Sequence, residues 1–386
     1  MTVDPNVITN AGIGLEPPKP LLGKKRAQED YEVADQWKLM WWKFRKHRMA
    51  MIALPVIAVM YLLTMCCEFF SPTLPLERFK SHKDCPPTAI HLFHEGSFVG
   101  PYVLEKESGL DPVTYRRTFV DSGEIIKLGF FVKGSPYKLW NLIPTNIHFF
   151  GPQELGGEFF LMGTDSLGRD VFTRALYGGR VSLSFALVSI FFTFMIGLTL
   201  GGLSGYMGGL VDGLVQRTID VIMSIPSIPL WMALAAALPK EMSSYTQYLL
   251  MCIIMSLIGW TGLARVVRGK ILSVREEEFV TAARLSGATH KRVIFKHMIP
   301  MFMSYIIVSI TGSIPATILG ETALSFLGLG LQAPTISWGT LLQDCQTIEA
   351  IAQQPWKMFP AAFIVITVLM FNFAGDGLRD AADPYK

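Results

Sequence analysis

The sequence predicts an all-α membrane protein with six transmembrane helices and a small β-rich insert between the first and second of them. Of the 386 residues, 51% are hydrophobic and only 17% are charged. The mean hydropathy is +0.38, which is too apolar for an ordinary soluble domain. The apolar residues also gather in runs that can cross about 30 Å of hydrocarbon at 1.5 Å per helical residue.

The N-terminal region, residues 1–48, is polar and then basic. Residues 1–30 have the composition of a mobile tail, and no apolar run before Met49 would serve as a signal peptide. Between Trp37 and Arg48, aromatic and cationic residues share helical spacing. This pattern suits a helix in the membrane interface, or simply the cationic flank of the first span. The basic flank places the N-terminus in the cytoplasm.

The first span is expected over residues 49–70, and the insert over residues 71–162. Alternating runs such as residues 125–132 predict short strands in the insert. Its histidines could bind a metal, but their irregular spacing favours surface histidines and no metal site; they are His82, His91, His94 and His148.

The five cysteines do not have metal-ligand spacing. Cys85 and Cys345 could both lie on the outer face and form a disulfide, although we favour free thiols. The small net charge of +3, without basic patches interleaved with aromatic residues, gives no indication of nucleic-acid binding.

The segment 163–180, GTDSLGRDVFTRALYGGR, precedes the second span. Asp165 and Ser166 could cap a helix there, and Arg169 could pair with Asp170. We interpret the segment as a structural lead-in and not as a catalytic site.

The second span, residues 181–206, has a glycine at every fourth position from Gly197 to Gly209. Such a small-residue face predicts close packing in the bundle or against a partner. It is not a phosphate-binding loop, because no strand precedes it and no Gly-Lys-Ser/Thr follows.

The third span, residues 212–238, should be kinked or broken at Pro226 and Pro229. Asp220 is an intramembrane acid and hence a functional candidate. We favour a structural role for it, either in a pair with Arg217 or as the cap of a broken helix.

Three more spans are expected over residues 245–264, 301–319 and 356–374, with a possible break at Gly312 and Pro315 in the fifth. The cations that follow the fourth span place the next loop in the cytoplasm. Counting spans from the N-terminus gives the same side, and places the C-terminus there as well.

That loop, residues 273–300, should form an elbow of two short helices. Ser273 and Glu276 have the spacing of a capping box. Gly287 suits a left-handed helix end, and Thr289 can cap a second helix that ends at Pro300.

The elbow resembles the EAA loop of permease subunits in bacterial ABC importers, and more fully that of the C-type permeases of dipeptide and oligopeptide importers. The resemblance implies that this loop is the coupling helix that docks on a partner ATPase. The matching residues are Glu278, Ala282, Ala283, Arg284, Gly287, Ala288, Arg292, His297, Ile299 and Pro300.

Three further segments resemble the same family: 163–180, 321–339 and 375–384. In the second, ETALSFLGLG followed by a Trp-Gly pair implies a re-entrant turn at the outer mouth of a pathway. Glu321 could meet a cationic group of the substrate, although a structural acid is the favoured alternative. The possible substrate-pathway residues are Glu321, Trp338 and Asp220.

The resemblance implies a type I ABC importer permease in the bacterial inner membrane, with residues 163–386 as its core. Expected partners are a homologous second permease, two ATPase subunits, a periplasmic peptide-binding protein and the lipid bilayer. We expect no catalytic residue and no cofactor in this chain, since it has no Walker motif; ATP and Mg would bind the partner ATPases.

The long insert, with the phrase FVKGSPYKLW at 131–140, is similar to that of microcin C-type peptide importers. It implies an oligopeptide or modified-peptide cargo, such as microcin C or a muropeptide. A permease for nickel or another small solute is the alternative. A membrane enzyme or channel is disfavoured, because the spans show neither a catalytic set nor a charged ring.

Overall fold

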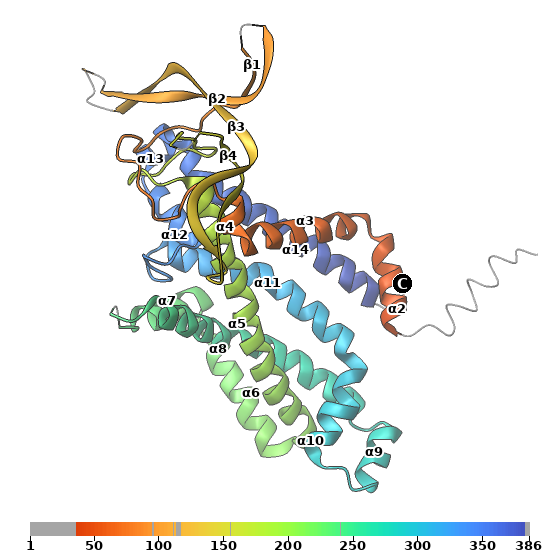
Figure 1. The fold of residues 1–386 in the computed structure, drawn as a ribbon. Coiled ribbons are helices and arrows are strands. Elements are labelled where there is room, and N and C mark those ends of the chain that lie inside the picture. Colours follow the sequence, from red (N-terminus) through yellow and green to blue (C-terminus); the bar gives the residue numbers. More distant parts are fainter. Residues whose placement is uncertain are drawn as a thin grey trace, which may run out of the picture.

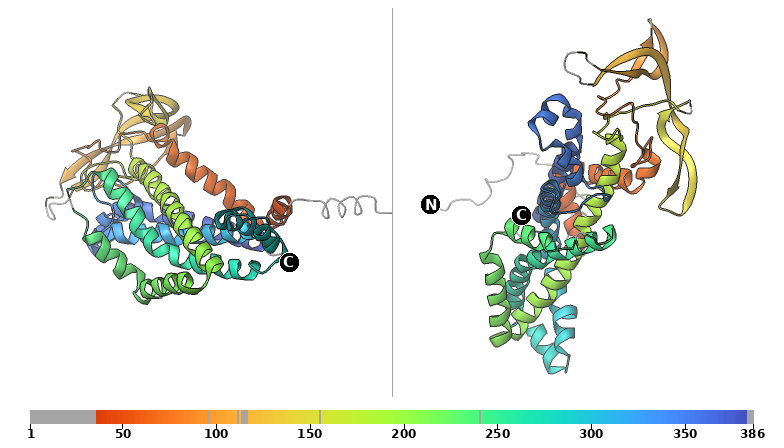
Figure 2. Two further views of the ribbon diagram at one scale, coloured as in Figure 1. Left: turned by 90° about the horizontal axis from the view of Figure 1, so that it is seen from below. Right: turned by 90° about the vertical axis from the view of Figure 1, so that its left-hand side faces the viewer.

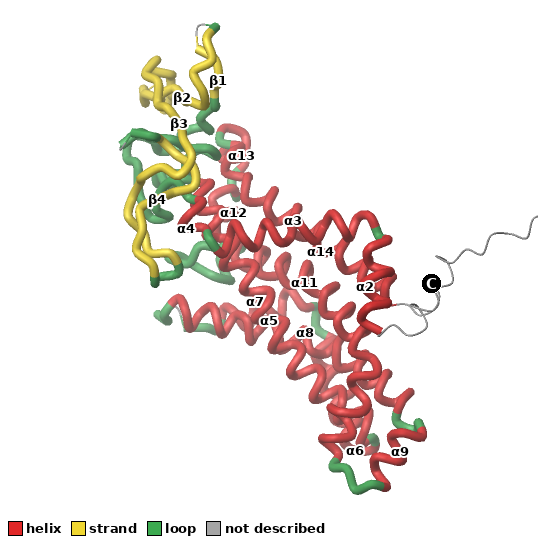
Figure 3. The backbone as a smooth tube through the Cα atoms, turned by 45° about the vertical axis from the view of Figure 1, so that its right-hand side comes forward, coloured by secondary structure: helices red, strands yellow, loops and turns green. Residues whose placement is uncertain are grey.

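A computed structural model of the chain describes residues 36–94, 96–110, 112, 117–154, 156–239 and 241–382. The expected tail, residues 1–30, and the last residues of the 375–384 motif lie outside these ranges. The described chain is an elongated helical assembly with a β-sheet at one end and the short helix α9 at the other (Figures 1 and 2). All the described strands lie at the end opposite α9 (Figure 3).

Five helical segments are long and apolar enough to cross a membrane, and a bent helix pair makes up to six. The first four helical elements after the N-terminal helix α2 (Gln36–Lys46) are α3 (Arg48–Met65), α4 (Cys67–Phe70), α5 (Val171–Met207) and α6 (Gly209–Ser224). They are followed by α7 (Ser227–Ala236), α8 (Ser244–Val274), α9 (Glu278–Leu285), α10 (His290–Arg292), the π-helix η1 (Val293–Met298) and the 3-10 helix η2 (Ile299–Phe302). The C-terminal elements are α11 (Met303–Phe326), α12 (Trp338–Leu342), η3 (Gln343–Cys345), α13 (Ile348–Gln353), η4 (Pro355–Met358) and α14 (Phe359–Ala382).

The expected third span is two helices. α6 and α7 meet at an angle of 88°, and the break falls at Ile225 and Pro226. A proline disfavours the helical conformation of the residue before it, and Ile225 is indeed extended at ψ 132°. The predicted break at Pro226 is therefore confirmed, whereas Pro229 continues α7.

The prediction of a break at Gly312 and Pro315 is wrong. Pro315 lies inside α11, which continues without interruption to Phe326. Neighbouring helices can satisfy a carbonyl that an internal proline frees in a membrane helix. Glu321 therefore lies in the last turns of a long helix, and the turn of this segment begins only after Phe326.

The glycine face of α5 packs against α8. A Cβ on Gly201 would lie 2.5 Å from the Ala264 carbonyl oxygen, and one on Gly205 would lie 2.8 Å from Ile271 Cβ. Gly197 meets Leu263 in the same way. The prediction of close packing is thus confirmed within the chain for these three glycines. Gly209 lies beyond the end of α5, and nothing is within 4 Å of its Cβ position.

The insert contains the predicted strands: β1 (His91–His94), β2 (Ser97–Leu110), β3 (Arg117–Leu139) and β4 (Ile143–Pro152). They pair antiparallel in chain order. The long β3 pairs with β2 along its first half, from Leu110↔Arg117 to Tyr102↔Lys127, and with β4 along its second half. A small core of Val103, Ile126, Leu128 and Phe159 lies beneath the sheet.

Two of the four insert histidines are buried, so the prediction of surface histidines is wrong for them. His148 is 1% exposed, and its ring nitrogens contact the carbonyl oxygens of Ser71 and Ser135 at 2.5 and 2.9 Å. His82 is 7% exposed and pairs with Glu158. The hydrogen bond to Glu158 raises the pKa of His82, and burial opposes that rise.

Cys85 and Cys345 are both free and buried. Burial raises the pKa of the Cys85 thiol to about 12, so this thiol stays protonated and weakly nucleophilic.

The N-terminal helix α2 packs against the end of the chain. Met40 and Phe44 are buried together with Ala50 of α3 and Ala381 of α14. A Cβ on Gly377 would lie only 2.3 Å from Ala50 Cβ, so this glycine permits the close approach. One face of the predicted interfacial helix is therefore covered by protein.

Candidate functional site

The elbow after α8 begins later than its sequence indicates. α8 continues to Val274, and the Ser273 hydroxyl donates to the Lys270 carbonyl inside that helix at 2.8 Å. The predicted helix start near Ser273 is therefore wrong. α9 begins at Glu278, and Glu277 precedes it without a side-chain cap.

The turn after α9 follows the prediction. Gly287 adopts φ +77°, a left-handed conformation that glycine accepts without a Cβ clash. The Ala288 amide donates to the Ala283 carbonyl at 3.1 Å, and the Gly287 amide to the Arg284 carbonyl at 3.0 Å. These bonds close the helix C-terminus.

The second arm of the elbow is not a separate short helix. The Thr289 hydroxyl accepts from the Arg292 amide, as expected for a cap. The helical path then runs through α10, η1 and η2 directly into α11, so that residues 290–326 form one segment. Pro300 lies in the first turn of η2, where its missing N–H is tolerated. The prediction that the arm ends at Pro300 is wrong.

α9 is attached to the bundle mainly through the side chain of Val280. Val280 is completely buried and belongs to a cluster formed by α5, α8 and the η1–η2 segment, which includes Ile271, Val293, Ile294 and Met298. Ala283 and Ala288 pack at its edge. Their small side chains let the elbow lie close to the helix ends.

A second attachment, which the sequence analysis missed, is Tyr206 at the end of α5. The guanidinium carbon of Arg284 lies 4.8 Å from the centre of the Tyr206 ring. The Tyr206 hydroxyl lies 3.2 Å from Nδ1 of His290. Both arms of the elbow therefore contact one aromatic side chain, a contact that only spatial proximity reveals.

The outer face of α9 is open. Glu278 and Ala282 of α9 are exposed, as is Arg292 of α10, and Leu285 is 84% exposed. Leu285 and Phe279, which is 36% exposed, leave apolar surface on the outside of α9.

The helix ends above the elbow are joined by ion pairs. Nε of Arg268 in α8 donates to Oδ1 of Asp212 in α6 at 2.5 Å, and the Ser204 hydroxyl of α5 donates to the same carboxylate at 2.5 Å. Asp220 pairs with Arg265 at 2.6 Å. The expected pair with Arg217 is therefore wrong. A residue in another helix can approach Asp220 more directly than a neighbour on its own helix.

Glu321 and Trp338 are part of a buried polar cluster, with exposures of 1% and 0%. The hydroxyls of Ser182 and Ser325 donate to the Glu321 carboxylate at 3.1 and 2.8 Å. The Trp338 amide donates to the Ser182 hydroxyl at 3.1 Å, and its indole donates to the Ala175 carbonyl at 2.9 Å. The cluster joins α5, α11 and α12. It agrees with the structural interpretation of Glu321 rather than with direct substrate contact.

The segment 163–174 also has a structural role, but with different pairs. Asp170, and neither Asp165 nor Ser166, caps α5, by accepting from the amides of Phe172 and Thr173. Asp165 accepts from Arg169 Nε at 2.7 Å and also pairs with Arg174. The expected Arg169–Asp170 pair is therefore wrong. The segment is bound to the rest of the chain, since the Trp356 indole donates to the Thr164 carbonyl at 3.0 Å.

Within the described residues, no group of three or more His, Cys, Asp or Glu side chains could hold a metal ion. The elbow is suited to transmitting movement between α9 and the membrane helices. Val280 and Tyr206 attach α9 to the ends of α5, α8 and the α11 segment together. A force on α9 would therefore act on three helices at once.

Two family profiles match the chain. Residues 197–385 match the binding-protein-dependent transport system inner membrane component, and residues 35–87 match the N-terminal transmembrane domain of oligopeptide transport permease C. Residues 88–196, which include the whole sheet, lie outside both matches.

Among similar curated proteins is the oligopeptide transport system permease protein OppC of Bacillus subtilis, 40% identical over 58% of this chain and 70% of that protein. The dipeptide transport system permease protein DppC of the same organism is 39% identical over 63% of this chain and 71% of that protein. The oligopeptide permease OppC of Haemophilus influenzae is 39% identical over 64% of this chain and 74% of that protein.

A chain of an inward-facing MetNI methionine ABC transporter has a TM-score of 0.41 and 21% identity, over 54% of this chain and 95% of that one. That likeness is too weak to assign the fold. The sequence matches are sufficient on their own: the chain belongs to the binding-protein-dependent transport permeases, in the group of the oligopeptide and dipeptide permease C proteins.

Proposed function

We propose that this chain is a permease subunit of a bacterial inner-membrane ABC importer for peptides, and that the α9 elbow is where a partner ATPase docks. The observation that carries the proposal is the attachment of α9. It is exposed on its outer face, yet Val280 and Tyr206 connect it to three membrane helices. A coupling element needs both properties.

The proposed complex contains a homologous second permease, two ATPase subunits that bind ATP and Mg, and a periplasmic peptide-binding protein. ATP binding would close the ATPases and displace α9, and the helices would then change between outward and inward access. The elbow and both termini would face the cytoplasm, and the insert the periplasm. The opposite placement of sheet and elbow in Figure 1 and the cations around the elbow support this orientation.

Peptide cargo is supported by the names of the similar proteins, which are oligopeptide and dipeptide permeases. The insert favours a larger or modified peptide, such as microcin C or a muropeptide, because it adds a sheet that neither family profile covers. Glu321, Trp338 and Asp220 would act in the pathway indirectly, by positioning helices, since the first two are buried and the third is ion-paired.

The test is peptide-stimulated ATP hydrolysis by the complex purified with its partners. Leu285→Asp places a charge on the open face of α9 without touching the core, and should lower the stimulation at least about tenfold, which corresponds to about 1.4 kcal/mol of lost coupling. Leu110→Asp in the insert is the matched control, since Leu110 is 68% exposed and remote from the elbow.

Gly287→Val tests the turn itself, because a β-branched residue is strained at φ +77°. Gly123→Val is its control: Gly123 has φ +86° and open space around its Cβ position, but lies in the sheet. We expect coupling to fall only in the elbow variant. Full stimulation and assembly in both Leu285→Asp and Gly287→Val would exclude the elbow as the docking site.

A further inference from the structure

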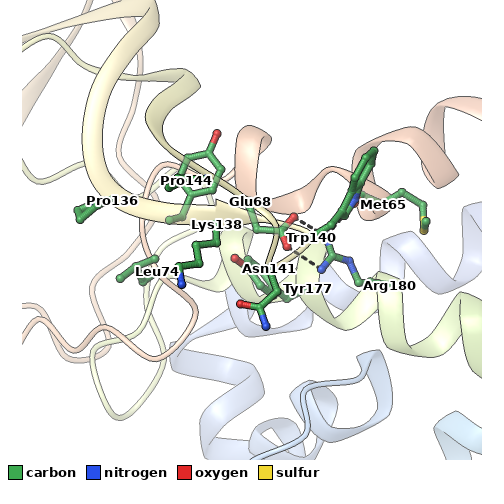
Figure 4. Close-up of a pocket in the computed structure, with 11 residues that line it drawn as sticks. Met65, Glu68, Leu74, Pro136, Lys138, Trp140, Asn141, Pro144, Tyr177 and Arg180 are labelled. Atoms are coloured by element: carbon green, nitrogen blue, oxygen red, sulfur yellow. Dashed lines mark hydrogen bonds and ion pairs between the residues drawn. The ribbon is translucent and has the colours of Figure 1, made fainter.

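An open groove of about 830 Å³ lies where the β3–β4 hairpin folds back onto the ends of two membrane helices (Figure 4). The hairpin contributes Lys138, Trp140 and Asn141, and α5 contributes Tyr177 and Arg180. None of the sites described above uses this groove.

An ion pair marks the level of the groove in the membrane. Residues 49–67 and 181–211 contain no charged side chain, and Glu68 and Arg180 are the first charges beyond these apolar runs. Nη1 of Arg180 donates to Oε1 of Glu68 at 2.8 Å. Because the pair joins the two runs, both end at the same level. We therefore expect the groove to lie at the boundary between hydrocarbon and water.

The tip of the β3–β4 hairpin is hydrogen-bonded to the end of α3 at this level. The Trp140 indole donates to the carbonyl of Met65, the last residue of α3, at 2.7 Å. Nη2 of Arg180 donates to the same carbonyl at 2.7 Å. Trp140 and Asn141 take φ values of 50° and 60°, which make the tight turn that brings the tip back to the helix.

The chemistry of the tip is that of a membrane interface. Leu142 and Ile143 follow the turn and are 78% and 55% exposed. Trp and Tyr gather where hydrocarbon meets headgroups, and a lysine stem can lie along apolar surface while its ammonium stays in water. Since Glu68 neutralises Arg180, the positive charge of the groove comes from Lys138. Figure 4 shows the Lys138 and Asn141 side chains extending from the hairpin into the groove beside Tyr177.

We propose that this groove binds a glycerophospholipid of the surrounding bilayer. Its phosphate would lie at Lys138 and the Asn141 amide, and an acyl chain would lie along Leu142 and Ile143. The bound lipid would fasten the insert to the membrane beside the first span. A peptide in transit is the competing occupant, but the exposed apolar tip at the hydrocarbon boundary favours a lipid.

The first experiment counts the phospholipids retained by the full complex after exchange into detergent from vesicles of phosphatidylglycerol and phosphatidylethanolamine, by native mass spectrometry. Lys138→Glu should weaken retention of phosphatidylglycerol about tenfold. Lys127→Glu is the matched control, because it reverses a charge on the same strand where β3 pairs with β2, away from the groove. Equal retention in the two variants would overturn the proposal.

The second experiment places a photo-crosslinking residue at Leu142 in the same complex. A crosslink to phospholipid, lost in Lys138→Glu and kept in Lys127→Glu, supports the proposal. A crosslink to added peptide or to a partner subunit in place of lipid overturns it. Both readouts are independent of ATP hydrolysis, so the lipid site can fail while the coupling role of α9 stands, and the reverse.

Discussion

The β-sheet insert and the α9 elbow are both polar excursions from the membrane helices, and they are attached to those helices by different kinds of contact. Besides the rings of Phe69 and Phe70 that pack on Phe149, the insert is joined through specific polar atoms. Its Asp84 pairs with Lys357 at 2.6 Å, and its Cys85 amide donates to the Thr164 hydroxyl at 2.8 Å, in the segment that Asp165 ties to Arg174 of α5. The elbow is attached by the packing of Val280 in an apolar cluster and by the contact of Arg284 with the ring of Tyr206. Polar attachment requires each partner atom, whereas apolar attachment depends mainly on volume and can shift slightly.

The difference suits the two proposed tasks. A coupling element must move with its helices, and packing against several helix ends permits small displacements. A sheet fixed at the membrane boundary needs one position. α5 connects the two regions, because Asp170 caps its first turn beside the insert and Tyr206 lies at its other end.

The largest effect is expected at the polar attachment of the insert. Asp165→Ala leaves the buried Arg174, which is 7% exposed, without its carboxylate. Removing one partner of a buried ion pair costs about 3–5 kcal/mol. Thermal unfolding of the purified complex should show this loss. Asp220→Ala breaks an exposed pair and should cost less than about 1 kcal/mol. Similar losses in the two variants would mean that the 163–174 segment is not a buried attachment.

A smaller effect is expected along α5. In Gly201→Ala, the new Cβ would lie 2.5 Å from a backbone oxygen of α8 that cannot rotate away. Overpacking of this kind costs about 1–3 kcal/mol, and it should also weaken peptide-stimulated ATP hydrolysis, because α5 and α8 would separate above the elbow. Gly213→Ala, with nothing near its Cβ position, should leave both unfolding and stimulation unchanged. Normal behaviour of Gly201→Ala would show that α5 and α8 do not need this contact.

The stability of the insert should depend on pH near neutrality. The bond to Glu158 raises the pKa of His82, so its stabilisation is complete below the unfolded-state value near 6.5 and is lost as pH rises through the folded-state value. We expect faster hydrogen exchange in residues 97–110 and 117–139 as pH is raised, after correction for the intrinsic rate, with a change of about 1 kcal/mol. His82→Asn should abolish this dependence. An equal response in the elbow would point to another titrating group.

The smallest effect is expected at Tyr206. Tyr206→Phe removes the hydroxyl near His290 but keeps the ring beneath Arg284, and should cost about 0.5–1.5 kcal/mol. Tyr206→Ala removes both contacts and should loosen α9 further. Hydrogen exchange of residues 278–290 would measure the difference. If the two variants exchange alike, the ring does not hold the elbow.

Local rules predicted what depends on neighbours in the chain. The left-handed Gly287, the Thr289 cap and the break at Pro226 follow from backbone chemistry within a few residues. The same rules were wrong at Ser273 and Pro315, where tertiary packing continued a helix that the local signals would have ended. The predicted ion pairs failed in two different ways. Asp220 was matched to a neighbour on its own helix but pairs with Arg265 of α8, whereas Asp170 accepts from the backbone amides of Phe172 and Thr173 as a helix cap.

The apolar spans, the β-rich character of the insert, the glycine face of α5 and the family motif of the elbow can all be read from the sequence alone. Each of these is a repeated or local pattern that many residues support. Three contacts became visible only in the folded chain: Tyr206 touches both arms of the elbow, Glu321 accepts a hydrogen bond from Ser182, and Trp140 reaches the end of α3. These contacts join residues far apart in the chain, and each depends on a few atoms that meet only when the helices and strands have packed.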